Sequence, residues 1–175
     1  MHFYLIQYLK LHIKNISVDR DTYKDYAFYD NLTGAYSRRY LEELIKKQSD
    51  GTYYLALIDL DCFKMINDEY GHLVGDEVLQ TVANEIKNII RDDDKIIRFG
   101  GDEFIILFKE INEEECLKVI ERIQSKLINN DLFNFDINFS YGLTRINNFI
   151  DLYDKIKEAD IQMYKYKRSN KNSVD

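Results

Sequence analysis

The chain has 175 residues, 45% of them hydrophobic, and 24 Lys and Arg against 31 Asp and Glu give a formal net charge of −7. This length fits one globular domain, and the acidic balance argues against a nucleic-acid binder with a broad basic surface. Two cysteines and three histidines are too few and too scattered for a disulfide framework or a zinc site. We therefore expect a cytoplasmic protein with reduced thiols.

The first thirty residues predict a helix and no membrane span. The apolar stretch at residues 1–9 ends at Lys10, far short of the roughly 20 residues that a span needs. Apolar side chains then recur at helical spacing, at Ile6, Leu9, Ile13 and Ile16. We predict a helical segment over residues 1–29, either a dimerisation and signalling stalk or a helix folded back on the domain.

After Asp30 the pattern changes to helices alternating with strands. In chain order it predicts a helix at 37–47, a strand at 53–60, a helix at about 76–90, a hairpin with strands at 95–98 and 104–108, a helix containing Cys116 and Leu127, a strand over the alternating residues 133–141, and a last helix at about 152–167. The expected fold is an α/β sandwich: a mixed, largely antiparallel sheet flanked by helices, with the strand at 54–60 in its centre.

Carboxylates occur where two of these strands end. Asp59 follows an apolar run, and Asp102 and Glu103 lie at the hairpin tip. If the hairpin lies beside the first strand, Asp59 and Asp102 converge, and carboxylates that close repel unless a cation lies between them. Mg²⁺ suits such a place because it takes oxygen ligands and usually binds phosphates as well. The alternative is that Asp59 and Asp61 cap a helix starting at Phe63 and that the tip is a solvated turn.

A phosphate-bearing substrate would complete this site. Gly100 and Gly101 have no side chains that would obstruct approach of backbone N–H groups to phosphate oxygens. Lys64 and Lys167 would add positive charge. Each lysine, taken alone, is also a common solvated helix residue.

Together these residues resemble the GGDEF family of diguanylate cyclases. The family's hairpin signature is matched by Arg98-Phe99-Gly100-Gly101-Asp102-Glu103-Phe104. The resemblance runs in order from Asp30 to about Asn172, through Asp30-Asn31-Leu32-Thr33-Gly34, Asp59-Leu60-Asp61-Cys62-Phe63-Lys64-Met65-Ile66-Asn67-Asp68, Gly71-His72, Gly75-Asp76-Glu77-Val78-Leu79, Ser140-Tyr141-Gly142, and Ala159-Asp160 with Tyr164 and Lys167. It predicts a GGDEF domain over residues 30–175.

The resemblance implies a fold related to polymerase palms and nucleotide cyclases, acting as a homodimer that joins two GTP into cyclic di-GMP and releases pyrophosphate. The ribose 3′-OH of each GTP would attack the α-phosphate of the other. The resemblance also implies two Mg²⁺ ions per active site, with Mn²⁺ as an alternative, held by Asp59, the Leu60 carbonyl and Asp102, with support from Glu103. Asp102 would also accept the proton of the 3′-OH.

Asn67, His72 and Asp76 fall where the family contacts its substrate. A carboxylate accepts both the N1–H and N2–H₂ donors of guanine, whereas adenine presents an acceptor at N1. Asp76 therefore favours GTP over ATP. The alternatives are a helix N-cap or first-turn role for Asp76 and a structural hydrogen bond for His72.

Arg91-Asp92-Asp93-Asp94 precedes the hairpin and fits the family's RxxD inhibitory site. Arg91 would bind the guanine face and edge of the product, and Asp94 would accept from its N–H groups. The alternative is a polar helix end followed by a solvated turn.

Four positions depart from the common family pattern, and they are Ala35, Ser37, Tyr166 and Asn170. None of them is an expected metal ligand. The competing function is a catalytically weak GGDEF module that binds cyclic di-GMP or GTP as a receptor, and the intact carboxylates Asp59, Asp102 and Glu103 argue against it.

Overall fold

The computed structural model describes residues 28–47 and 51–171. Its centre is a five-stranded sheet in the order β1-β3-β4-β2-β5. The strands are β1 (Tyr36–Ser37), β2 (Tyr53–Leu60), β3 (Lys95–Arg98), β4 (Glu103–Lys109) and β5 (Phe139–Ile146). β1 pairs parallel with β3 and every other pair is antiparallel. The predicted mixed sheet is confirmed, although β4 is its middle strand and β2 lies between β4 and β5.

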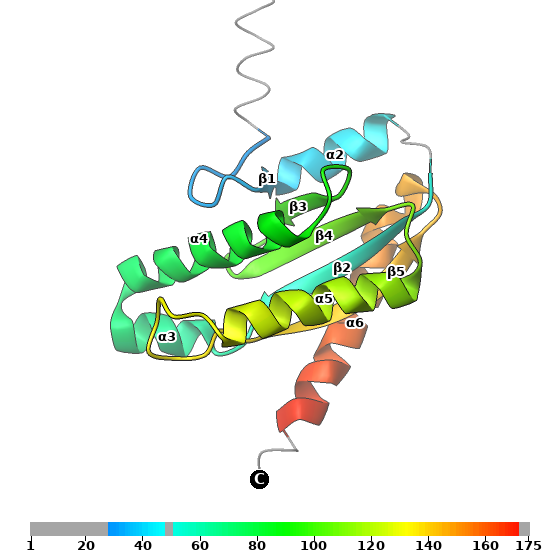
Figure 1. The fold of residues 1–175 in the computed structure, drawn as a ribbon. Coiled ribbons are helices and arrows are strands. Elements are labelled where there is room, and N and C mark those ends of the chain that lie inside the picture. Colours follow the sequence, from blue (N-terminus) through cyan, green and yellow to red (C-terminus); the bar gives the residue numbers. More distant parts are fainter. Residues whose placement is uncertain (1–27, 48–50, 172–175) are drawn as a thin grey trace, which may run out of the picture.

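Helices cover both faces of this sheet (Figure 1). They are α2 (Arg38–Lys47), α3 (Phe63–Tyr70), α4 (His72–Ile89), α5 (Glu113–Ile128), the 3₁₀ turn η1 (Phe149–Asp151) and α6 (Leu152–Lys171). Successive side chains of a strand point to opposite faces, so Ala56 and Ile58 pack with α4 and α5. Leu55 and Leu57 pack with α2 and α6 on the other face. The strand is buried on both sides, which is why its sequence is a continuous apolar run.

The predicted strand over residues 133–141 is wrong in its first half. β5 begins at Phe139, opposite Leu60, the last residue of β2. Before Phe139 there is no strand to pair with, because Cys62 turns the chain into α3 with a φ of 59°. Phe133 and Phe135 instead stack at 5.2 Å in a loop. Their alternation reflects packing against the core and not a ladder of backbone hydrogen bonds.

The boundaries of α4 also differ from the prediction. The helix begins at His72, a full turn before Asp76, and Gly71 with a φ of 87° separates it from α3. The predicted helix before Asp30 lies almost entirely in residues 1–27, outside the described residues. Among the described helices, none is long and apolar enough to span a membrane.

Both cysteines are free thiols. Cys116 is buried in the core between α5 and the sheet, and burial, with help from nearby acidic groups, raises its pKa to about 12. Cys62 is exposed.

Gly142 allows β5 and α6 to approach closely. A Cβ at this position would lie 1.9 Å from the carbonyl oxygen of Ala159 and 2.9 Å from the Met163 nitrogen. These are backbone atoms of α6, so a side chain would push the helix from the sheet. The position of α6, and of the residues it carries, therefore depends on this glycine.

We predict that Gly142→Ala lowers the free energy of unfolding by about 1 to 3 kcal/mol, because overpacking at a close contact shifts backbone. Urea unfolding followed by circular dichroism measures this change. Gly101→Ala is the matched control, since a Cβ there meets nothing within 4 Å, and it should change stability by less than about 0.5 kcal/mol. Equal effects of the two substitutions would contradict the packing argument.

Candidate functional site

The end of β2 lies beside the β3–β4 hairpin, as the sequence predicts. Asp59 is directly opposite Glu103 in the β2–β4 register. Side chains so paired start about 5 Å apart on one face of the sheet. The Leu60 N–H continues the pairing and donates to the Asp102 carbonyl at 3.2 Å. The nearest carboxylate neighbour of Asp59 across the sheet is thus Glu103, and Asp102 joins it through the backbone.

The hairpin turn is held by bonds to one carbonyl. Phe99 and Gly100 N–H both donate to the Glu103 oxygen, at 2.8 and 3.2 Å. A Cβ on Gly100 would lie 2.3 Å from Glu103 Oε2, so Gly100 leaves room for this carboxylate. Gly101 is exposed at the tip. The Gly100 N–H is used within the turn, and the expected contact of both glycines with phosphate stays a prediction.

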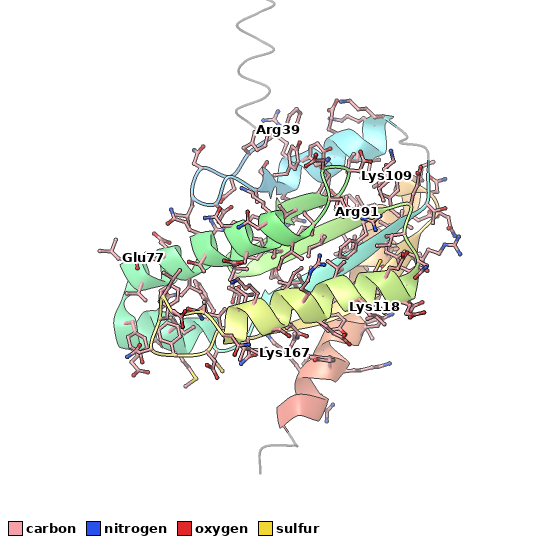
Figure 2. All side chains as sticks on the ribbon, viewed as in Figure 1. Arg39, Glu77, Arg91, Lys109, Lys118 and Lys167 are labelled. Atoms are coloured by element: carbon pink, nitrogen blue, oxygen red, sulfur yellow. The ribbon has the colours of Figure 1, made fainter. Side chains whose placement is uncertain are left out.

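Helix α6 brings a cation to this end of β2. Asp59 shares a face with Leu55 and Leu57, the face that α6 covers. Lys167 (labelled in Figure 2) forms an ion pair with Asp59 Oδ1 and lies 3.9 Å from Asp61 Oδ1. The buried Ser140 hydroxyl donates to Asp61 Oδ1 at 2.9 Å.

Negative charge collects around Glu103. Burial raises the pKa of Glu103, and the carboxylates of Asp59, Asp102 and Asp160 raise it further. Lys167 acts in the opposite direction. The field at this edge of the sheet therefore favours a cation.

The donor atoms here suit a hard divalent cation. They are carboxylate oxygens and the Leu60 carbonyl, which faces the hairpin because the N–H and C=O of a strand residue point to the same side. Among residues 28–47 and 51–171, no three His, Cys, Asp or Glu side chains lie close enough together to hold a metal. In this arrangement the Lys167 ammonium supplies the positive charge at Asp59, so a metal ion there would compete with it.

The predicted base-contacting residues lie on α3 and α4. A Cβ on Gly75 would lie 2.0 Å from Asn67 Oδ1, so the Asn67 amide rests against α4 one residue before Asp76. His72 is the first residue of α4, and His72, Asp76 and Lys64 are exposed. Gly71 holds the N-cap position and the first turn has no acidic residue, which rules out the capping alternative for Asp76.

The RxxD residues lie at the other end of β4. Asp94 is 6% exposed, and its two carboxylate oxygens accept the N–H groups of Arg91 and Lys109, each at 3.0 Å. Asp94 thus closes the turn between α4 and β3. Because Glu103 and Lys109 are the two ends of β4, the turn lies roughly 20 Å from the hairpin tip.

Arg91, labelled in Figure 2, is exposed. It lines a cavity of about 260 Å³ whose other polar and aromatic walls include Tyr29, Tyr36, Lys87 and Lys95. The structure gives Asp94 a folding role and leaves the product contact of both residues a prediction.

The sequence analysis assigned no catalytic or binding role to several residues that make polar contacts near these two regions. Asp61 lies beside Lys167 and accepts from Ser140. Arg122 of α5 donates to the Ile89 carbonyl at 2.8 Å beside the RxxD turn, and Arg98 donates to the Gly101 carbonyl. Arg98, Asp61 and Ser140 lie inside the motifs that match the family, so their positions in the sequence already indicated that they lie near the site. Arg122 lies outside these motifs, and no sequence pattern indicated its role.

Comparison with known proteins identifies the family. The family model described as the GGDEF domain of diguanylate cyclases matches residues 27–173. The chain belongs to the GGDEF domain family. It is 35% identical to diguanylate cyclase DgcZ of Escherichia coli K12 over an aligned length of 151, and the match covers 82% of this chain and 51% of DgcZ.

Solved GGDEF structures share the fold. Diguanylate cyclase SiaD from Pseudomonas aeruginosa, in complex with its activator SiaC, superposes with a TM-score of 0.74 at 26% identity, over 94% of this chain and 67% of SiaD. The GGDEF domain of DgcB from Caulobacter crescentus, in complex with cyclic di-GMP, superposes with a TM-score of 0.72 at 25% identity, over 82% of this chain and 91% of the DgcB domain. The chain spans only about half the length of DgcZ.

We predict that Asp94→Ala destabilises this GGDEF domain by about 2 to 4 kcal/mol, because two backbone N–H groups lose the buried carboxylate that accepts from them. Chemical denaturation measures the loss. Asp93→Ala, at an exposed neighbouring position, should stay within about 0.5 kcal/mol of the unsubstituted chain. If Asp94→Ala were equally mild, the two bonds to the Asp94 carboxylate would not stabilise the turn.

Proposed function

We propose that this chain is a diguanylate cyclase that condenses two GTP into cyclic di-GMP and pyrophosphate. The observation that carries the proposal is the β2–β4 register, which sets Asp59 opposite Glu103 and next to the turn bearing Asp102. A GGDEF domain that only binds nucleotide, without catalysis, would be expected to lack one of these carboxylates. The relationship to proteins named diguanylate cyclases supports the same activity.

The reaction needs a base, bound phosphates and a nucleophile in line with phosphorus. Asp102 accepts the proton of the ribose 3′-OH, and the 3′ oxygen forms a bond to the α-phosphorus of the other GTP. The bond between that α-phosphorus and the departing pyrophosphate breaks. Asp59, the Leu60 carbonyl and Asp102, with support from Glu103, would hold the Mg²⁺ ions, which stabilise charge on the attacking and leaving oxygens when bound. Lys64 and Lys167 would neutralise phosphate charge, and the backbone at Gly100 and Gly101 would approach the phosphates.

Selection of guanine falls to α3 and α4. Asp76 accepts the N1–H and N2–H₂ groups of guanine in a bidentate pair. Asn67, seated against Gly75, and His72 complete the base contacts. Adenine would leave the Asp76 carboxylate facing an acceptor, so the proposed substrate is GTP.

The proposed active unit is a homodimer. One chain offers one nucleotide site, and each of the two attacks joins nucleotides held by different chains. The segment before Asp30 would bring the domains together. Product control would act through Arg91 and Asp94, on the turn at the far end of β4.

We predict that the full chain converts GTP with Mg²⁺ into cyclic di-GMP, resolved by chromatography, and leaves ATP unchanged. Asp102→Ala should lower the rate at least about 1000-fold, because the proton acceptor and a metal ligand are lost together. Asp93→Ala, remote from the site, is the control for the loss of one carboxylate. Saturable GTP binding by a folded dimer without product would reject the cyclase and favour the receptor function.

We predict that Arg91→Ala raises the concentration of cyclic di-GMP that halves the initial rate by about tenfold or more, since a charge-assisted contact to the product is removed. The measurement is the initial rate at increasing added product. Lys118→Ala is a matched control, because Lys118 is an exposed cation on α5 outside the RxxD turn. An unchanged inhibition curve for Arg91→Ala would contradict the inhibitory-site proposal.

A further inference from the structure

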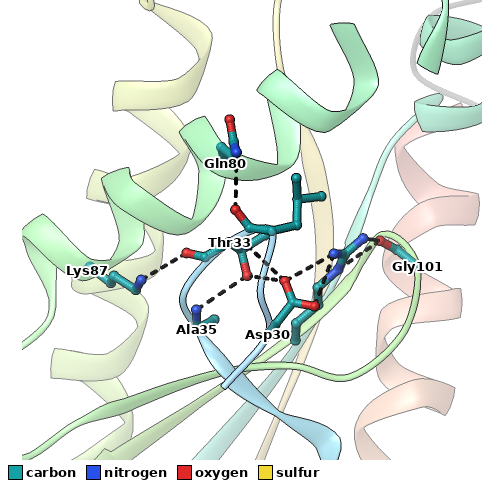
Figure 3. Close-up of polar contacts among 8 residues, drawn as sticks. Asp30, Thr33, Ala35, Gln80, Lys87 and Gly101 are labelled. Atoms are coloured by element: carbon teal, nitrogen blue, oxygen red, sulfur yellow. Dashed lines mark hydrogen bonds and ion pairs between the residues drawn. The ribbon is translucent and has the colours of Figure 1, made fainter. Parts of the chain in front are cut away.

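Arg98, at the end of β3, connects the hairpin turn to the loop formed by residues 30–35. Its Nη1 donates to Asp30 Oδ1 at 3.1 Å and Oδ2 at 3.3 Å. Its Nη2 and Nε donate to the Gly101 carbonyl at 2.8 and 3.3 Å (Figure 3). One guanidinium therefore holds a carboxylate on one side and the tip of the turn on the other.

The Gly101 carbonyl belongs to the peptide unit that leads into Asp102. A peptide unit is planar, so fixing this oxygen also fixes the direction of the Asp102 N–H and limits where its Cα can lie. The backbone bonds of the turn involve the N–H groups of Phe99 and Gly100 and the carbonyls of Asp102 and Glu103, and the Gly101 carbonyl is bonded by Arg98. Gly100 and Gly101 themselves impose few backbone limits. Arg98 thus restrains the residue that the proposed reaction uses as proton acceptor.

The loop that holds Arg98 is itself well restrained. Asp30 Oδ1 also accepts from the Thr33 N–H at 2.9 Å and the Thr33 hydroxyl at 2.7 Å. The Gly34 N–H donates to the Asp30 carbonyl and the Asp30 N–H to the Ala35 carbonyl, at 2.7 and 2.8 Å. Asp30 is therefore a fixed point from which Arg98 can be held.

Helix α4 holds the same loop from the opposite side. Lys87 Nζ donates to the Thr33 carbonyl at 2.9 Å, and Gln80 Nε2 donates to the Leu32 carbonyl at 3.2 Å (Figure 3). The Gln80 hydrogen bond reaches the loop, whereas Arg98 bonds both the loop and the hairpin turn. It provides an internal control for the effect of disturbing the loop.

Burial and charge make the Asp30–Arg98 contact effective. The two side chains are 24% and 17% exposed, so water competes less than at a surface pair. Burial alone would raise the pKa of Asp30, but bonds from Thr33 and Arg98 outweigh it and leave the pKa below its ordinary value. Asp30 is therefore a carboxylate at neutral pH, and a planar guanidinium suits two acceptors in different directions better than a lysine.

We propose that Asp30 and Arg98 are positioning residues for the catalytic turn: Asp30 orients Arg98, and Arg98 holds the Gly101 peptide so that Asp102 stays in place. This inference rests on the proposed cyclase function and deepens it. Neither residue is among the groups proposed to contact the substrate or the metal ions. The position of the 30–35 loop therefore governs the geometry of the site on the hairpin.

The kinetic test uses the full chain with Asp30→Asn, Arg98→Lys, the double variant and Gln80→Ala. Asp30→Asn keeps an oxygen for Thr33 and loses the charge that orients Arg98. We expect each single variant at the pair to lower kcat by about tenfold to 100-fold, as displacement of a catalytic group does. The KM for GTP should stay within about threefold, because the base-contacting residues are on α3 and α4.

The double variant distinguishes a chain of contacts from two separate effects. If Asp30 acts only through Arg98, the double variant is no slower than Arg98→Lys, because coupled residues are not additive. Gln80→Ala should keep kcat within about twofold of the unsubstituted chain. The proposal would be overturned if the kcat losses of the two single variants multiplied in the double variant. It would also be overturned if Asp30→Asn had the kcat of the unsubstituted chain.

Amide hydrogen exchange tests the same proposal without any activity. In Asp30→Asn, the N–H groups of Gly100 and Leu60, which bond to Glu103 and Asp102, should exchange about tenfold faster or more, and in Gln80→Ala they should not. Unchanged exchange in Asp30→Asn overturns the proposal. If the unsubstituted chain makes no cyclic di-GMP, the cyclase function fails while exchange still decides the positioning role. If Arg98→Lys does not fold, Asp30→Asn alone decides it.

Discussion

The site depends on the antiparallel register between β2 and β4. That register sets Asp59 opposite Glu103 and joins Leu60 to Asp102 through the backbone. A shift of one residue would turn every side chain of β2 to the other face of the sheet. The apolar residues on both faces oppose such a shift, because Leu55 and Ala56 belong to different halves of the core. Packing across the whole sheet thereby fixes the placement of two carboxylates at its edge.

Placing several carboxylates together at the edge of the sheet costs electrostatic energy, and a cation on a helix outside the sheet offsets part of it. Several carboxylates repel one another near Glu103, and Lys167 on α6 provides the opposing charge. The close approach of α6 to β5 at Gly142 brings that lysine within reach. Packing of a glycine in the core and charge balance at the site are therefore linked through one helix.

The two ends of the β3–β4 hairpin differ in how their polar groups are used. At the RxxD end, the Asp94 carboxylate is buried and already accepts two backbone N–H groups. At the tip, Asp102 follows two glycines, and Arg98 of β3 bonds the Gly101 carbonyl while Asp30, outside the hairpin, accepts from Arg98. Bonds within the turn hold the RxxD end, whereas the tip is also tied, through Arg98, to the 30–35 loop.

The sequence by itself determined the elements and the chemistry they carry, because side-chain periodicity and turn composition act over a few residues. It located β2, the hairpin and the carboxylates at their ends, and its order of motifs indicated the family. Only the tertiary structure decided which groups meet: Lys167 and Asp59 are 108 residues apart, and Arg98 and Asp30 are 68 apart. It also decided that Phe133 and Phe135 pack in a loop, because β2 ends at Leu60 and leaves them no partner strand. Pairing and register come from the packed core, which local pattern does not specify.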